Sequence, residues 1–218
     1  MGGQRLFTFD RRIGKPLVCG ADEAGRGCLA GPLVAAAVLF DYSRVTTREL
    51  RALANLNDSK AHTPQTREAL YPLIVRSAAR VTVVSRCVRG IDGRGLHRTN
   101  LLALRDAMLG AGAGHADVAY VVDGFKVPEF EYEQRAIIDG DATSAAIAAA
   151  SIIAKVSRDR YMAIAEREHP GWGFGEHMGY STTVHREAII RTGVSPLHRM
   201  SFQSSAYVGL DRRTAASS

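Results

Sequence analysis

The chain has 218 residues, 46% of them hydrophobic, which is enough for a real core and suits one domain with a small appendage. The mean hydropathy is −0.08, and no apolar run approaches the ~20 residues that cross a bilayer, which argues against a membrane protein. The net charge of +6 and the isoelectric point near 9.5 favour a polyanionic partner such as nucleic acid.

Two features bear on the compartment. The segment Met1–Arg12 is polar and lacks the apolar core of a secretion signal. The 3 cysteines, Cys19, Cys28 and Cys87, show no paired C-x-x-C spacing. These features predict a reduced, cytoplasmic protein that uses its thiols as small apolar residues.

The first half of the chain alternates between sheet and helix patterns. Short apolar runs bounded by glycine or proline predict strands, and apolar residues at helical spacing predict helices. In chain order we expect a flexible arm (1–15), two strands joined by a tight turn (Leu17–Phe40), a partial helix (Arg48–Leu53), a turn (Asn57–Lys60), a helix (Thr63–Ala79) and a strand (Val81–Val88).

The second half continues with a loop (Asp92–Gly95), a helix (His97–Leu109), a buried strand (Val118–Val122), a further strand (Phe130–Ile138) and one long alanine-rich helix (Asp141–Glu168). This order predicts a mixed sheet with helices on its faces. Beyond Glu168 the chain is rich in glycine and aromatic residues before a helix at Val184–Arg191. The predicted organisation is a main domain (16–168), a C-terminal helical extension (169–210) and a disordered tail (211–218).

Acidic residues stand where these elements end or begin. Asp22 and Glu23 end the first apolar run, Asp123 ends a buried strand, and Asp141 precedes the alanine-rich helix. Converging carboxylates are unfavourable unless a cation joins them, and Mg²⁺ or Mn²⁺ prefers such oxygen ligands. The acids therefore predict a divalent-metal site. Taken singly, Asp123 is also typical of a turn and Asp141 of a helix N-cap.

Basic residues of the alanine-rich helix are candidates for phosphate contacts. Lys155 and Arg158 lie on roughly one face with Ser151, on a helix thin enough to approach the sheet closely. The alternative is an ordinary packed helix with solvated basic ends, which we favour for Arg158 and leave open for Lys155.

Two other site patterns are present but disfavoured. Gly25-x-Gly27-x-x-Ala30 matches a dinucleotide fingerprint, yet that motif must open a helix, and here a strand is predicted after Pro32. A zinc site could use His169, His177 and His185. These histidines lack the helical i, i+4 pairing and the cysteine partners typical of zinc sites.

The motifs resemble those of type 2 ribonucleases H (the ribonuclease HII family), in the family's order and over roughly Leu17 to His198. They are Gly20-Ala-Asp22-Glu23-Ala-Gly25-Arg26-Gly27 with Ala30-Gly31-Pro32-Leu33, then Asp58-Ser59-Lys60, Asp123-Gly124, Gly140-Asp141 leading into Ile147–Asp159, and His177-x-Gly179-Tyr180-x-Thr182-x-x-His185. The only departures are a less typical helix start at Gly93–Asn100 and unmatched ends.

The resemblance implies an α/β protein with an RNase H-like mixed sheet flanked by helices and a small helical C-terminal extension. It implies an endonuclease that cuts the RNA strand of RNA–DNA hybrids and incises 5′ to single ribonucleotides in duplex DNA. Two ions, Mg²⁺ or Mn²⁺, are implied in the active complex, and the products carry 5′-phosphate and 3′-hydroxyl ends. A monomer without membrane contact is expected.

Residue by residue, the resemblance assigns catalysis and metal binding to Asp22, Glu23, Asp123 and Asp141. It assigns substrate binding to the glycine-arginine-glycine corner and to a tyrosine that senses the RNA–DNA junction, which are Gly25, Arg26, Gly27 and Tyr180 here. Lys60 and Lys155 are our candidates for phosphate contacts.

Two rivals belong to other classes. A non-catalytic, basic nucleic-acid-binding module explains the charge but leaves the converging acids unexplained. A phosphotransferase on a similar sheet would need a cleft between two comparable domains, for which 218 residues are too few.

Overall fold

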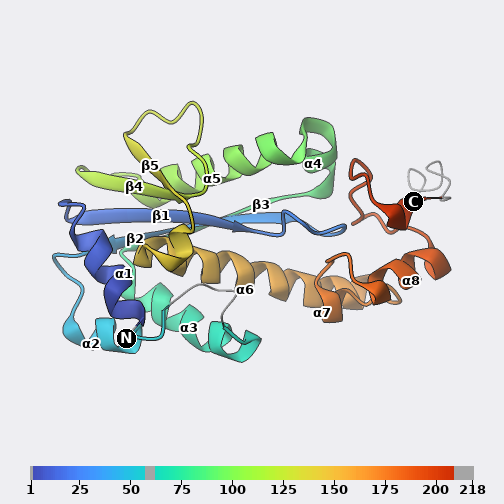
Figure 1. Ribbon diagram of the computed structural model, residues 1–218, viewed down its shortest axis with the longest axis horizontal. Coiled ribbons are helices and arrows are strands. Elements are labelled where there is room, and N and C mark those ends of the chain that lie inside the picture. The colour runs from blue at the N-terminus through green and yellow to red at the C-terminus, as the bar shows by residue number, and fades with distance from the viewer. Residues whose placement is uncertain (1, 57–61, 209–218) are drawn as a thin grey trace.

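The computed structural model describes residues 2–56 and 62–208, which are built around one mixed sheet (Figure 1). Its strand order is β3-β2-β1-β4-β5. The pairs β1–β2 and β2–β3 are antiparallel, while β1–β4 and β4–β5 are parallel. The strands are β1 (Leu17–Ala24), β2 (Leu33–Asp41), β3 (Arg80–Arg86), β4 (Val118–Asp123) and β5 (Gln134–Ile137).

Helices cover both faces of this sheet, with α4 and α5 on one side and α1, α3 and α6 on the other (Figure 1). At the far end of α6 lie α7 and α8. The helices are α1 (Gly2–Arg11), α2 (Thr47–Ala52), α3 (Pro64–Ser77), α4 (Val88–Arg94), α5 (Leu96–Gly112), α6 (Ala145–Glu168), α7 (Phe174–His177) and α8 (Thr183–Thr192), with the short 3₁₀ turns η2 (Gly140–Ala142) and η3 (Ser205–Tyr207).

The two faces of β1 belong to two separate cores because side chains alternate along a strand. Val18 packs into the core beneath α6, whereas Cys19 and Ala21 pack into the core beneath α5. By the same alternation, Asp22 faces the α6 side and Glu23 the α5 side. Consecutive acids therefore approach the site from different sides of the sheet.

Helix α6 crosses β1 at Gly20 with almost no space between the two backbones. A Cβ at Gly20 would lie 2.2 Å from the carbonyl carbon of Ala146, so only glycine fits. The alanines expected to make a thin helix are buried in this contact, as Ala145, Ala146, Ala148, Ala149 and Ala150. This close packing fixes the start of α6 beside the strand that carries Asp22 and Glu23.

The expectation of a flexible arm over 1–15 is wrong for the part that the structure describes. Helix α1 buries Leu6 and Phe7, and the Phe7 ring meets Phe40 of β2 edge-on at 5.7 Å. The carboxylate of Asp10 is also buried and accepts hydrogen bonds from Ala146 N–H at 2.9 Å and from Tyr42 Oη at 2.7 Å. The helix therefore anchors the start of α6.

The buried Asp10 predicts a specific pH dependence of stability. Burial raises its pKa from 3.8 to about 6, so the folded state binds this proton more tightly than the unfolded state. Its contribution to stability is full below pH 3.8 and is lost as the pH rises through 6. Relative to Asp10→Asn, which cannot ionise, we expect the wild type to lose about 2 kcal/mol of unfolding free energy between pH 4 and pH 7.

Urea unfolding of both proteins across this range measures that difference. The control is Asp117→Asn, which changes an exposed aspartate at a left-handed position that asparagine also tolerates. Parallel pH profiles for the wild type and Asp10→Asn would show that Asp10 does not titrate as described.

Other boundaries differ from the sequence prediction in physically instructive ways. The loop expected at Asp92–Gly95 is wrong, because α4 extends through Arg94 and buries Val88 and Ile91. The Asp92 carboxylate accepts hydrogen bonds from Met200 N–H and Ser201 N–H, so distant contacts support this helix. The last strand is also shorter than the Phe130–Ile138 expected.

The helix expected at Val184–Arg191 is present as α8, and the other helical parts of the described C-terminal extension are the short α7 and η3. The predicted tail (211–218) and the turn Asn57–Lys60 lie outside the described residues, so both stay predictions. Within 2–56 and 62–208 there is no helix long and apolar enough to cross a membrane.

Candidate active site

Two of the four predicted acids are brought together by strand register. The parallel pairing of β1 and β4 ends with Ala21 opposite Val122. The next residue on each strand is an acid, Asp22 and Asp123. Both strands run in the same direction, so these two carboxylates leave the sheet at the same edge.

The carboxylates at this edge of the sheet lie close enough to repel one another. Asp22 is 6% exposed, and its pKa is raised well above the usual value by burial and by the nearby charges of Glu23 and Asp123. A hydrogen bond with Ser151 of α6 opposes part of that rise. The pKa of Glu23 is also raised, chiefly by burial. The site therefore disfavours its own negative charge.

The arginine of the glycine corner partly offsets this repulsion. Arg26 Nη1 donates to Glu23 Oε1 at 3.3 Å, and the half-exposed Arg26 side chain keeps contact with solvent. The Arg26 charge lowers the pKa of Glu23, against the larger effect of burial. Only the Arg26 side of this pair is half exposed, since the Glu23 side chain is 11% exposed.

Asp141 lies in the η2 turn and is buried at 6% exposure. The expectation that one helix starts at Asp141 is wrong, because α6 begins at Ala145 and its N-cap is Ser144. Asp141 is thus no cap of α6. Its neighbour Gly140 donates its N–H to Asp123 Oδ1 at 2.7 Å, which ties η2 to the other acids.

The donor set fits a hard divalent cation. Within 2–56 and 62–208, no three His, Cys, Asp or Glu side chains are arranged to hold a metal ion as they stand. Three carboxylates nevertheless line one cavity, and two of them have pKa values raised by burial and mutual repulsion. A divalent ion would relieve that repulsion with the oxygen ligands that Mg²⁺ and Mn²⁺ prefer.

The cavity, of about 380 Å³, gathers most of the predicted site residues. Its walls carry Asp22, Glu23, Asp123, Gly25, Arg26, Gly27, Lys155 and Tyr180, together with Ala24, Arg67 and Ser151. The sequence reasoning missed Arg67 as a site residue and named Ser151 only for its helix face. Asp141 is not part of this wall, and Lys60 lies outside the described residues. The cavity thus lies where the ends of β1 and β4, the glycine corner, α3, α6 and the C-terminal extension meet.

The two glycines of the corner differ in what the fold demands. Gly25 has φ +95°, and a Cβ there would lie 2.1 Å from Arg158 Nε. Gly27 has nothing of the protein within 4 Å of such a Cβ, so the fold itself does not require glycine there. The open space in front of Gly27 belongs to the cavity.

Tyr180 stands at the rim, 41% exposed. Its main chain bridges to Cys28, and Lys155 Nζ lies 5.2 Å from the centre of its ring. Lys155 is itself held by Asp159 at 2.8 Å. The ring and the ammonium group therefore form one surface beside the acids.

Two buried arginines hold this corner in place. Arg158 donates to the carbonyls of Pro32, Ala30 and Met178 and is fully buried, so the solvated basic helix end favoured for it from the sequence is wrong. Arg199 donates to the carbonyls of Gly25, Gly31 and Arg26 at 2.7 to 3.2 Å. Nothing in the sequence pattern singled out Arg199, because its role depends on a contact across 174 positions.

The disfavoured zinc pattern does not form within the described residues. His177 and His185 stack with centroids 4.1 Å apart, and their ring nitrogens face hydrogen-bonding partners. His169 ends α6 as its C-cap. The dinucleotide pattern fails as expected, because the strand β2 follows Pro32.

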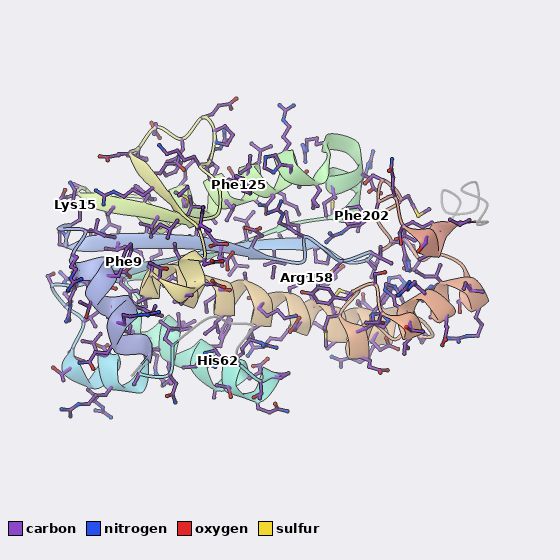
Figure 2. All side chains as sticks on the ribbon, in the orientation of Figure 1. Phe9, Lys15, His62, Phe125, Arg158 and Phe202 are labelled. Carbon is purple, nitrogen blue, oxygen red and sulfur yellow. The ribbon has the colours of Figure 1, made fainter. Side chains whose placement is uncertain are left out.

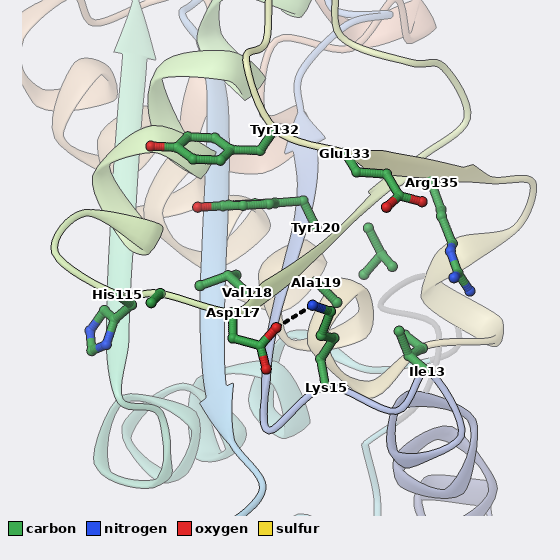
Figure 3. Close-up of a pocket in the computed structure, with 12 residues that line it drawn as sticks. Ile13, Lys15, His115, Asp117, Val118, Ala119, Tyr120, Tyr132, Glu133 and Arg135 are labelled. Atoms are coloured by element: carbon green, nitrogen blue, oxygen red, sulfur yellow. Dashed lines mark hydrogen bonds and ion pairs between the residues drawn. The ribbon is translucent and has the colours of Figure 1, made fainter.

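A second pocket at the opposite end of β1 and β4 lacks these features (Figure 3). There Tyr120 and Tyr132 stack at 5.3 Å, and Lys15 forms an ion pair with Asp117. Figure 2 shows Lys15 at the far end of the sheet from Arg158. The acids and the glycine corner thus mark the first cavity as the candidate active site.

A mixed sheet of this order, with acids at the ends of its adjacent parallel strands, defines an RNase H-like fold. The ribonuclease HII family profile matches residues 19–205. A ribonuclease HII of Mycobacteroides abscessus is 47% identical over 196 residues, 90% of this chain and 80% of the relative. The chain belongs to the ribonuclease HII family and is a metal-dependent endoribonuclease.

Solved structures agree on the fold. The ribonuclease HII of Archaeoglobus fulgidus, determined in complex with PCNA, has a TM-score of 0.70 and 26% identity, covering 86% of this chain and 96% of its own. Bst ribonuclease HIII in complex with Mn²⁺ has a TM-score of 0.65 and 17% identity, covering 88% of this chain and 66% of its own. At that identity the second likeness concerns the fold alone. Family membership rules against the non-catalytic and phosphotransferase rivals.

Proposed function

We propose that this endoribonuclease hydrolyses the RNA strand of RNA–DNA hybrids and incises duplex DNA 5′ to single embedded ribonucleotides. The products carry 5′-phosphate and 3′-hydroxyl ends. The observation that carries the proposal is the shared cavity, whose wall combines carboxylates, the corner Gly25–Gly27 and Tyr180. In the cell, this activity removes ribonucleotides from DNA.

Asp22, Glu23, Asp123 and Asp141 are proposed to hold two Mg²⁺ or Mn²⁺ ions. When bound, these ions supply Lewis-acid stabilisation of the charge that develops on the attacking and leaving oxygens. The carboxylates act as ligands, and the raised pKa of Asp22 reflects how strongly burial and the neighbouring carboxylates disfavour its charge.

The corner Gly25–Gly27 is proposed to read the 2′-hydroxyl, the one group that distinguishes a ribonucleotide sugar from its deoxy counterpart. Backbone amide and carbonyl groups can donate to and accept from that hydroxyl if the chain approaches closely. The open space before Gly27 permits such an approach, and the buried Arg199 fixes the carbonyls of Gly25 and Arg26. The Arg26 side chain, which lines the same cavity, is proposed to hold the adjacent phosphate.

Tyr180 is proposed to sense the RNA-to-DNA junction. Its exposed ring can pack flat on a deoxyribose, whereas a ribose at that position would present a 2′-hydroxyl to the ring. The site then favours a ribonucleotide followed by a deoxyribonucleotide, with the cut on the 5′ side of the last ribonucleotide. Lys155, whose Nζ lies 5.2 Å from the centre of the Tyr180 ring, is proposed to contact the phosphate.

One assay tests this function. The protein is incubated with duplex DNA that holds a single ribonucleotide, with Mg²⁺, with Mn²⁺ or with a chelator. Ion-dependent incision 5′ to the ribonucleotide is the expected result, and an all-DNA duplex is the control. Cleavage at other positions, or cleavage that survives the chelator, would contradict the proposal.

Binding should depend steeply on salt because the basic residues contact phosphates rather than bases. For about four phosphate contacts, affinity should fall on the order of 100-fold between 50 and 200 mM salt. Lys155→Gln should make the slope of log affinity against log salt shallower by about 0.9.

This slope is measured by fluorescence anisotropy without divalent ions. Lys15→Gln is the matched control, since Lys15 pairs with Asp117 at the far end of the sheet and should leave the slope unchanged. An affinity that does not vary with salt would mean that phosphate contacts do not dominate. Lys60 stays a predicted contact that the same measurement can test.

The remaining expectations join this proposal. We propose that the protein acts as a monomer. The three cysteines are free, with Cys19 and Cys28 buried, which supports a reduced cytoplasmic setting.

A further inference from the structure

Three histidines form a buried cluster directly behind Tyr180. They are His177 at the end of α7, His185 in α8 and His198 in the segment that follows α8. The rings of His177 and His185 stack, and the Phe174 ring packs against His177, His185 and His198 at 5.7 to 6.1 Å. None of them borders the cavity that holds the acids. The proposed reaction therefore leaves this cluster without a role.

The hydrogen bonds of the cluster run in one direction. Ser195 N–H, which can only donate, lies 2.8 Å from His198 Nδ1, and Ser195 Oγ, which accepts from Leu197 N–H, lies 2.9 Å from the same nitrogen. A neutral His198 must then carry its proton on Nε2, which lies 3.1 Å from His185 Nε2 and donates to it. His185 in turn carries its proton on Nδ1 and donates to the Tyr180 carbonyl at 2.9 Å. A chain of donors thus leads from Ser195 to Tyr180.

No charged form of these rings satisfies the same contacts. A proton on His198 Nδ1 would face the Ser195 N–H, and two protonated Nε2 atoms would oppose each other between the rings. Burial also keeps both rings neutral, because it lowers the pKa of His185 to about 4 and that of His198 to about 3. The arrangement of protons is therefore unique at neutral pH.

The segment before Tyr180 is fixed in the same way. Gly179 N–H donates to His177 Nδ1 at 3.1 Å, and the Gly179 carbonyl accepts from Leu29 N–H at 2.8 Å. Tyr180 N–H donates to the His177 carbonyl at 2.9 Å. The backbone of Gly179 and Tyr180 is thus held on both sides, which fixes the direction of the Tyr180 Cα–Cβ bond.

We infer that His185 and His198 are positioning residues, whose directed hydrogen bonds hold the Tyr180 carbonyl and so aim its ring at the sugar beyond the junction. The inference deepens the proposed role of Tyr180 and rests on it. It predicts that breaking the donor chain affects junction cleavage more than cleavage within a long hybrid.

The first test needs no substrate. Long-range ¹⁵N–¹H spectra of the imidazoles in the wild-type protein at neutral pH should show His185 protonated on Nδ1 and His198 on Nε2. The variants His185→Asn and His198→Asn assign the signals. A charged ring, or the opposite tautomer in either residue, would overturn the inference.

The second test compares two replacements of His185. Phenylalanine keeps the ring but removes the donor to Tyr180, whereas the asparagine amide can donate from the position of Nδ1. We expect His185→Phe to lower the ratio of single-ribonucleotide to hybrid cleavage rates about 2- to 10-fold, and His185→Asn to retain most of the ratio. His115→Gln, an exposed histidine at the far end of the sheet, is the control and should leave both rates unchanged.

His198→Asn breaks the chain one step earlier and covers the case in which His185→Phe fails to fold by circular dichroism. The asparagine side chain can accept from Ser195 N–H but is too short to reach His185. The ratio of single-ribonucleotide to hybrid cleavage rates should therefore fall, as it does for His185→Phe. Equal losses on the two substrates, or equal behaviour of the His185→Phe and His185→Asn variants, would overturn the positioning role.

A double variant distinguishes a failure of this inference from a failure of the proposed function. In a Tyr180→Ala background, His185→Phe should lower the ratio no further, because the ring to be aimed is gone. A further fall would contradict the inference. If Tyr180→Ala alone left the ratio of single-ribonucleotide to hybrid cleavage rates unchanged, that result would contradict the proposed function itself. The imidazole spectra would still decide the tautomers in the wild type.

Discussion

Asp22→Asn or Asp123→Asn should lower the cleavage rate by roughly 1000-fold, corresponding to about 4 kcal/mol of lost transition-state stabilisation. Each change removes one negative oxygen ligand while keeping the size of the side chain. The adjacent parallel strands place these two carboxylates at one sheet edge. After burial, which is the largest cause, the charge of Asp123 raises the pKa of both Asp22 and Glu23. Duplex binding should survive or tighten, because a negative charge near the phosphates is gone.

Single-turnover cleavage at saturating Mg²⁺ or Mn²⁺ measures the loss, and anisotropy with the same duplex measures binding. Asp117→Asn, at the other end of β4, is the matched control and should retain full activity. Near-normal cleavage by Asp123→Asn at saturating ion would refute the metal-site assignment. Asp141→Asn should be the mildest of the four amide variants, in keeping with its place outside the cavity wall.

Tyr180→Ala should cost more on a single embedded ribonucleotide than on a long RNA–DNA hybrid. Stacking of an aromatic ring on a nucleic acid is worth about 1–3 kcal/mol by analogy with base–aromatic contacts, or roughly a 5- to 150-fold loss in rate. A long hybrid offers no deoxyribose beyond the cut, so the ring contributes less there.

The measurement is the cleavage rate on both substrates, wild type against variant, at equal ion concentration. Tyr161→Ala is a close control, because Tyr161 is 41% exposed, as Tyr180 is, but lies on α6 away from the cavity. Equal losses on the two substrates would mean that Tyr180 supports the fold or general binding instead of sensing the junction.

Local sequence chemistry sufficed to predict the central strands and the place of the acids. The run Leu17–Phe40 contains its own turn signals, so β1, the glycine corner and β2 can be read without tertiary information. The convergence of Asp22 with Asp123 was also predictable, since both follow buried apolar runs. The roles of the individual site residues stay proposals until the variants are measured.

The errors arise where distant contacts decide the local structure. Helix α1 contains only a short apolar face, and its stability comes from packing Leu6 and Phe7 against β2. Helix α4 has glycines that favour a loop, yet Asp92 is tied to the segment after α8. The missed Arg199 is of the same kind, because its partners lie in the glycine corner at the other end of the sequence.

The two buried arginines also decide how the chain can be cut. A truncation after Glu168 looks like the removal of an appendage, but it would take Arg199 away from the carbonyls of Gly25, Arg26 and Gly31. It would also remove the Met178 carbonyl that accepts from Arg158. Buried groups left without partners cost about 1–3 kcal/mol each. The corner proposed to recognise ribose is thus held in place by a residue 174 positions further along the chain. A variant truncated after Glu168 should therefore not keep the geometry of this corner.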